Sequence, residues 1–177
     1  MNDSKISVRY AKALFESAAD KGSLDEARKD MLHLQELCKL EEFQYFLQSP
    51  VMKTSHKRKL LDDILENKTH ALTSGLLDIV FKNNRELYIP GIARNFEALY
   101  KKHNGIKSAV LLSAVAMDDK ARIKIEKLLG DSFKARVDLS IEEKKELIGG
   151  FVIRVEDQQY DASVANKLKT IKKQLLN

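Results

Sequence analysis

Apolar residues recur every three or four positions through most of residues 4–104, which is the spacing of amphipathic helices. Helix-ending signals at Gly22, at Ser49-Pro50 and at Asn104-Gly105 divide this pattern into segments joined by short links. The pattern predicts six helices, at about residues 4–19, 23–38, 41–48, 55–65, 71–82 and 90–104. Six short helices with short links are expected to form a compact bundle.

The second predicted helix opens with Ser23-Leu24-Asp25-Glu26, the residue pattern of a capping box. In a capping box, the side chains at the first and fourth positions accept hydrogen bonds from each other's free backbone N–H groups. We therefore expect the side chains of Ser23 and Glu26 to begin this helix.

The hydrophobic period changes after Gly105. Strands are expected where apolar residues run together or alternate with polar ones, at residues 107–115, 134–139 and 151–155, with a returning strand around Tyr160. Helical spacing recurs at residues 118–129, where Asp118 is the expected N-cap, and from Val164 to the C-terminus. The predicted fold class is mainly α: a six-helix N-terminal bundle, residues 1–105, followed by a small α+β C-terminal domain, residues 106–177.

The composition, with 44% hydrophobic and 32% charged residues, indicates packed domains and excludes a disordered chain. The net charge of +5 comes mainly from the last segment, where residues 162–177 carry four lysines and no acidic residue. Such a basic helix could contact a partner protein, lipid headgroups or nucleic acid, or could simply be solvated. We favour the interpretation that this basic helix contacts a partner protein.

A second basic run, Lys57-Arg58-Lys59, could contact phosphate. A solvated helix face is the preferred interpretation, because Asp62 and Asp63 follow within one turn.

The residues that carry chemistry in enzymes do not form recognisable motifs in this sequence. It has no glycine-rich nucleotide-binding loop, and room for the backbone at a strand start explains Gly149-Gly150 better than phosphate binding does. The four histidines lack ligand spacing, so no metal site is expected. The one cysteine, Cys38, lies on an apolar helix face and is expected to be a buried, unreactive thiol. The sequence predicts no cofactor and no catalytic site.

Two helices carry more apolar surface than a small bundle needs. At about 100° per residue, the apolar positions of the first helix span roughly 240° and those of the fifth roughly 200°, against little more than 100° for an ordinary surface helix. Each helix is either central in the bundle or covered on a second side by a partner. Since a six-helix bundle has little room for two central helices, their joint occurrence favours a partner.

Two segments resemble the signatures of a known family. Residues 9–16, RYAKALFE, look like the opening of the delta subunit of ATP synthase, whose mitochondrial counterpart is the oligomycin-sensitivity-conferring protein. Residues 147–157, LIGGFVIRVED, followed by DASV at 161–164 and Leu168, resemble the family's second signature. Order, spacing and length agree over the whole chain. One departure is Ala162, where many members have glycine.

The resemblance implies a non-catalytic stator subunit that links the catalytic head of F1Fo ATP synthase to its peripheral stalk. In the family, a groove between the first and fifth helices receives the N-terminal helix of an alpha subunit. The resemblance implies that the contacts with that helix are apolar residues of the first and fifth helices of this chain: Tyr10, Ala13, Leu14, Leu76, Ile79 and Val80.

The family's C-terminal domain meets the b subunits of the stalk. The candidate contacts here are the C-terminal lysines Lys167, Lys169, Lys172 and Lys173. The resemblance implies no small-molecule substrate, no nucleic acid and a membrane link only through the complex. With no transit peptide evident, the expected location is the cytoplasmic face of a bacterial inner membrane.

Two other hypotheses remain. The pI of about 9.1 would suit a basic nucleic-acid-binding protein, whose affinity should fall steeply with salt. The near-neutral first domain and the few aromatic residues argue against it. An enzyme with a diffuse active site is the third hypothesis.

Overall fold

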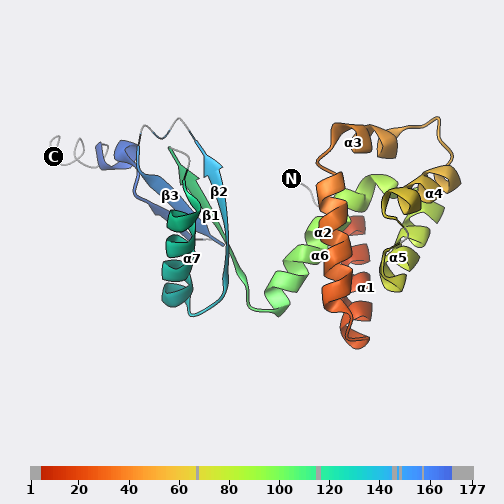
Figure 1. Cartoon of the computed structure of the whole chain (residues 1–177), viewed down its shortest axis with the longest axis horizontal. Coiled ribbons are helices and arrows are strands. Elements are labelled where there is room, and N and C mark those ends of the chain that lie inside the picture. The colour runs from red at the N-terminus through yellow and green to blue at the C-terminus, as the bar shows by residue number, and fades with distance from the viewer. Residues whose placement is uncertain are drawn as a thin grey trace. The chain divides into compact units, whose positions relative to one another are not determined.

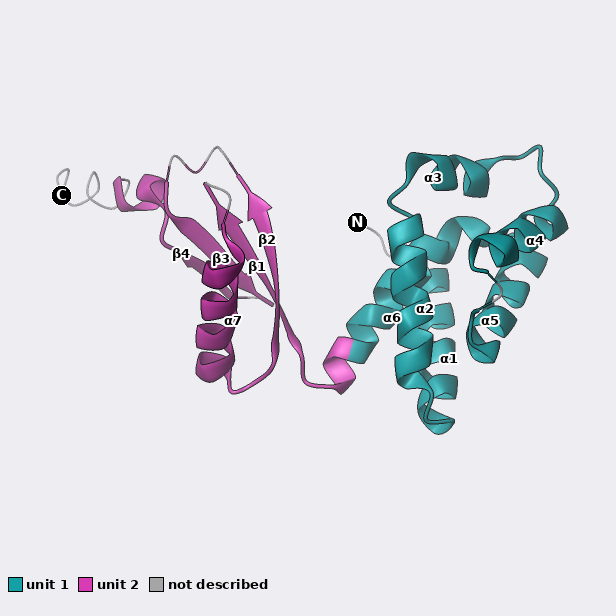
Figure 2. Ribbon diagram, viewed as in Figure 1, with its two compact units in different colours: residues 1–100 teal, residues 101–177 magenta. Residues whose placement is uncertain are grey.

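A computed structural model describes residues 5–66, 68–114, 117–144, 147, 149–156 and 158–168, and Figure 1 shows the arrangement of the elements. The chain divides into two compact units, residues 1–100 and residues 101–177 (Figure 2). The division falls within the last turn of helix α6, a few residues before the predicted boundary at Gly105.

Unit 1 is helical throughout its regular structure. Its α-helices are α1 (Lys5–Asp20), α2 (Leu24–Leu37), α3 (Glu41–Gln48), α4 (Thr54–Ile64), α5 (Ala71–Lys82) and α6 (Ile89–His103). Their limits differ from the predicted ones by about one residue, because the apolar spacing and the stop signals agree. The structure adds a short 3-10 helix, η1 (Glu86–Tyr88), which the pattern did not predict, so the description as six helices is incomplete.

The core of unit 1 is built from large side chains with almost no exposed surface, among them Phe81 and Phe96. The ring of Phe15 meets that of Phe96 edge-on, with centroids 6.0 Å apart, which connects α1 to α6. The half-buried guanidinium of Arg28 donates two hydrogen bonds, of 3.0 and 2.8 Å, to the carboxylate of the buried Glu97. This bidentate ion pair connects α2 to α6.

The start of α2 corrects the expected capping box. The Ser23 side chain makes no capping hydrogen bond, and its Oγ is buried without a partner among the described residues. The backbone explains this: Ser23 N–H donates to Ala18 O at 2.9 Å and Gly22 N–H to Ala19 O at 3.1 Å, with Gly22 at φ 65°. These bonds form a Schellman motif that ends α1, so the backbone N–H of Ser23 caps the C-terminus of the preceding helix.

Unit 2 contains a four-stranded sheet in the order β2-β1-β3-β4. The strands are β1 (Lys107–Ser113), β2 (Val137–Glu143), β3 (Phe151–Val155) and β4 (Gln158–Asp161). β1 runs parallel to β2 and antiparallel to β3, and α7 (Asp119–Phe133) connects the parallel pair. The buried core lies between α7 and the sheet, with Leu111 and Leu139 at its centre. The chain is therefore mainly helical with a small C-terminal sheet.

The boundary between α7 and β2 differs from the prediction. Helix α7 continues to Phe133, Lys134 adopts the left-handed conformation with φ 48°, and β2 begins only at Val137. The alternation that predicted a strand from Lys134 thus begins in a helix cap. At the other end the prediction is confirmed: Asp118 Oδ1 accepts a hydrogen bond of 2.9 Å from Ala121 N–H.

Gly150 confirms the steric interpretation of the glycine pair. Its φ is +81°, and a Cβ placed there would lie 2.5 Å from the carbonyl oxygen of Ala162. The neighbouring Ala162 N–H donates to Phe151 O at 3.0 Å, which joins the two segments where β3 begins. Only glycine fits this close approach.

Within the described residues, no helix combines the length and the apolar character needed to span a membrane.

Candidate functional site

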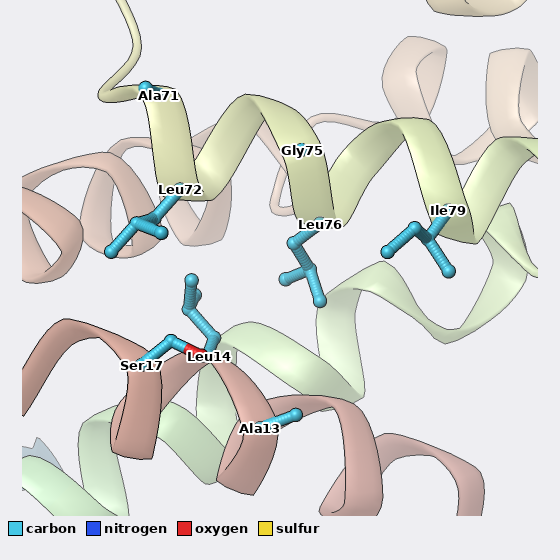
Figure 3. Close-up of a pocket in the computed structure, with 8 residues that line it drawn as sticks. All are labelled: Ala13, Leu14, Ser17, Ala71, Leu72, Gly75, Leu76 and Ile79. Atoms are coloured by element: carbon cyan, nitrogen blue, oxygen red, sulfur yellow. The ribbon is translucent and has the colours of Figure 1, made fainter. Parts of the chain in front are cut away.

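An open apolar groove runs between α1 and α5. Its volume is about 260 Å³. Figure 3 shows Leu72, Leu76 and Ile79 projecting from α5 toward α1, and Leu14 pointing from α1 into the same space. The lining residues are Ala13, Leu14, Ser17, Ala71, Leu72, Gly75, Leu76 and Ile79.

The chemistry of this lining suits an apolar ligand. Ser17 carries the only polar side chain among the lining residues that the structure describes. Ile79 is 51% exposed, which is high for a large apolar side chain. The lining side chains can accept an apolar surface, and they offer no group for acid–base chemistry.

The groove accounts for four of the six residues carried over from the family resemblance. Ala13, Leu14, Leu76 and Ile79 line it. Val80 is fully buried on the core side of α5, so it does not face the groove. The resemblance did not single out Ser17, Ala71, Leu72 and Gly75, which also line it. Small residues such as Gly75 add nothing to an apolar arc, although they make room for a ligand.

Tyr10, the sixth residue, fixes one end of the groove. It is only 9% exposed, and its hydroxyl accepts hydrogen bonds from Arg85 Nη1 at 3.0 Å and Asn83 Nδ2 at 3.4 Å. Asn83 also donates to Ile79 O at 2.8 Å. Tyr10 therefore joins the start of α1 to the end of α5 and sets the spacing of the two helices.

The far side of α5 is held by Arg58 of α4. The Arg58 guanidinium donates to Asp78 Oδ1 at 2.8 Å and to Ser74 Oγ at 2.8 Å, and it also pairs with Asp62. Arg58 is buried, which corrects the interpretation of residues 57–59 as a solvated face. Its partners on α5 lie 16 and 20 residues away, so local charge spacing did not reveal them.

Lys57, the first residue of the basic run, is also buried, which contradicts its interpretation as part of a solvated helix face. It is 3% exposed, and its Nζ donates to Glu86 Oε1 at 2.8 Å and to Leu47 O at 2.7 Å. Glu86 Oε2 has no partner among the described residues. This buried ion pair connects α4 to η1, while Lys59 is the exposed member of the run.

Groups that could support other chemistry are sparse in the described part of the chain. It holds no cluster of three or more potential metal ligands. Cys38 is buried, and burial raises the pKa of its thiol to about 11. It is therefore an inert thiol at neutral pH, as its apolar surroundings in the sequence predicted.

Only one of the four C-terminal lysines expected to contact the stalk lies within the described residues. Lys167 is exposed at the end of helical residues 164–168. Lys169, Lys172 and Lys173 lie outside the described residues.

Known proteins match this chain over nearly its full length. The family model "ATP synthase delta (OSCP) subunit" matches residues 6–175. A Flavobacterium psychrophilum protein described as ATP synthase subunit delta is 32% identical, with 100% of both chains covered. A protein of the same description from Amoebophilus asiaticus is 33% identical over 96% of this chain and 94% of its own.

A solved structure agrees with these sequence matches. A chain in the cryo-EM structure of the Toxoplasma gondii mitochondrial ATP synthase hexamer superposes with a TM-score of 0.79 at 25% identity, over 98% of each chain. With sequence and fold matched over nearly the full length, the chain belongs to the ATP synthase delta (OSCP) subunit family.

Proposed function

We propose that this protein is a non-catalytic subunit of the peripheral stalk of F1Fo ATP synthase, which holds the catalytic head against rotation. Its family membership over residues 6–175 carries the proposal. The rotor turns inside the head, so the head must be anchored if ion flow is to drive ATP synthesis. A stable mechanical joint is the whole requirement, and the protein needs no active site. The family membership favours this function over the nucleic-acid-binding alternative.

In this proposal, the groove between α1 and α5 receives the N-terminal helix of an alpha subunit. An apolar groove between two helices is a known mode of recognising an amphipathic helix. Burial of four large apolar side chains of such a helix contributes about 6–12 kcal/mol in total. Association costs several kcal/mol of this gain. If association costs at least about 4 kcal/mol, the net gain is at most about 8 kcal/mol, which corresponds to dissociation constants of about micromolar or weaker.

Residues 106–177 are proposed as the domain that meets the b subunits, with the basic C-terminal residues as the contact region. Residues 1–105, the proposed six-helix domain, hold the head. Two attachments on one chain strengthen each other, because the second binding event is intramolecular once the first has formed. Attached in this way, the protein would lie on the cytoplasmic face of a bacterial inner membrane.

A calorimetric titration of the full chain tests the head attachment. The ligand is a synthetic peptide with the sequence of the N-terminal helix of the same organism's alpha subunit. We expect binding with one-to-one stoichiometry. The double variant Ala13→Asp, Ile79→Asp should abolish it, because both residues line the groove and both side chains are exposed.

The matched control makes the same two kinds of substitution at exposed positions of unit 2, outside the groove, in Ala165→Asp and Ile123→Asp. These variants should bind the peptide as the unchanged protein does. Tyr10 is unsuitable for this test, because it is buried and its loss would disturb the fold. A folded protein that fails to bind the peptide would refute the proposed head attachment.

A further inference from the structure

One end of the groove carries three positive charges. Arg9 lies one helical turn before Ala13 on α1, and Lys82 lies one turn after Ile79 on α5, so both stand on the rim of the groove. Arg85 follows the end of α5 and donates a hydrogen bond to the Tyr10 hydroxyl. The guanidinium carbons of Arg9 and Arg85 are each 5.7 Å from the centre of the Tyr10 ring.

These cations lack acidic partners within the part of the chain that the structure describes. The nearest acid on α5, Asp78, is turned toward α4, where it pairs with Arg58. No ion pair forms between a described carboxylate and Arg9, Lys82 or Arg85. Like charges grouped on one ring repel each other, so a negative ligand at this end would relieve the repulsion as well as form new pairs.

The opposite end of the groove has a different balance. One turn beyond Ser17, α1 ends with Asp20 next to Lys21, whose charges offset each other. Across from them, the Asp30 carboxylate accepts a hydrogen bond of 2.8 Å from the backbone N–H of His70, the N-cap of α5. The side-chain charges along the groove therefore change from +3 at the Tyr10 end, with Arg9, Lys82 and Arg85, to −1 at the Ser17 end, with Asp20, Lys21 and Asp30.

We propose that the groove fixes the direction of its bound helix by charge: the acidic end of the helix lies over Arg9, Lys82 and Arg85. This inference rests on the proposed helix-binding function. The partner is an amphipathic helix with an apolar stripe of about two turns, the length from Leu72 to Ile79 at about 1.5 Å per residue. Acidic side chains follow within one turn at one end. Apolar contacts then supply affinity, while the charges select one of two opposite directions.

The first test measures the affinity of the full chain for the synthetic alpha-subunit peptide between about 50 and 500 mM NaCl, where screening weakens exposed charge pairs. The double variant Arg9→Gln, Lys82→Gln should bind about three- to tenfold more weakly at low salt, with a flatter salt dependence. Both side chains are exposed and make no hydrogen bond that supports the fold, so the variant should remain folded. The control Lys21→Gln, Lys59→Gln also removes two positive charges, both away from the Tyr10 end, and should leave affinity unchanged.

The second test locates the two ends of the peptide. A nitroxide label at the more acidic end should broaden the amide resonances of Ile79 and Asn83, and a label at the other end should broaden those of Ser17 and Ala71. The reverse pattern, or unchanged affinity in the double variant, would overturn the inference while leaving helix binding intact. A peptide that does not bind the unchanged protein would instead refute the proposed function, and the directional inference with it.

Discussion

Replacement of Gly75 by alanine should stabilise the protein and weaken the groove at once. Glycine inside a helix is less favourable than alanine by about 1 kcal/mol, because it loses more backbone entropy on folding. Gly75 lies in the middle of α5, and a Cβ added there meets no atom within 4 Å. We therefore expect Gly75→Ala to raise the free energy of unfolding of unit 1 by about 0.5–1 kcal/mol. The melting temperature should rise by roughly 2–8 °C.

The same methyl group enters the groove from its α5 wall, since Gly75 is one of the lining residues. A helix packed closely against α5 would have to shift away from it. Overpacking of this kind typically costs about 1 kcal/mol or more, which corresponds to at least about a fivefold loss of affinity. Calorimetric melting of the full chain and titration with the alpha-subunit peptide measure the two effects separately.

Gly91 provides the matched control, because it is also a glycine inside a helix. A Cβ at Gly91 would lie 2.6 Å from Ser7 Oγ and 3.1 Å from Ser7 Cβ. Ser7 is buried between α1 and α6, so Gly91→Ala should lower the melting temperature despite its gain in helix propensity. If Gly75→Ala destabilised the protein, or left peptide affinity unchanged, the assignment of an open and functional groove wall would be wrong.

Three further predictions concern a buried thiol, a helix cap and a buried ion pair. Cys38 should react with a thiol reagent only on unfolding, and because its folded pKa is raised to about 11, stability should fall as pH rises from about 9 toward 11, an effect that Cys38→Ala removes in pH-dependent urea melts. Asp118→Ala should cost unit 2 about 1 kcal/mol by removing the cap of α7, and Asp119→Ala, which loses no capping bond, should cost less in the same denaturation assay. Lys57→Met should cost about 3–5 kcal/mol because it leaves the Glu86 carboxylate buried and unpaired, whereas adding Glu86→Leu should restore most of the loss; equal stability of the single and double variants would contradict this.

Local pattern was sufficient for the helices of unit 1, whereas the groove and its residues were predicted from the family resemblance. Apolar spacing and stop signals set the helix limits to about one residue. The surplus apolar arcs of the first and fifth helices indicated the two elements that form the groove, but not which side of α5 was open. Val80 and Ile79 are adjacent in sequence, yet one is fully buried and the other 51% exposed. Packing against the other helices determines which side of α5 is buried, and the local sequence does not reveal it.

The errors at Lys57 and Arg58 have a common cause, which is that the residue that pairs with each of them lies far along the chain. Lys57 and Arg58 resemble solvated residues until Glu86 and Asp78 are brought to them by folding. The strand predicted from Lys134 begins three residues too early, because the alternating pattern runs through the cap of α7 before β2 begins at Val137. No periodic signal reveals a left-handed cap at a lysine.

The central position of β1 has a consequence for the order of folding. Its neighbours come late in the chain: Lys107 pairs with Val137 and Ala109 with Val155. Unit 1, by contrast, is built from helices that form through local contacts. Because long-range strand pairing must first close large loops, we expect unit 1 to fold early and unit 2 to fold slowly. During synthesis, β1 would wait with both edges unpaired until β2 is made and with one edge unpaired until β3 is made, and in that interval the chain is most exposed to aggregation and most in need of a chaperone.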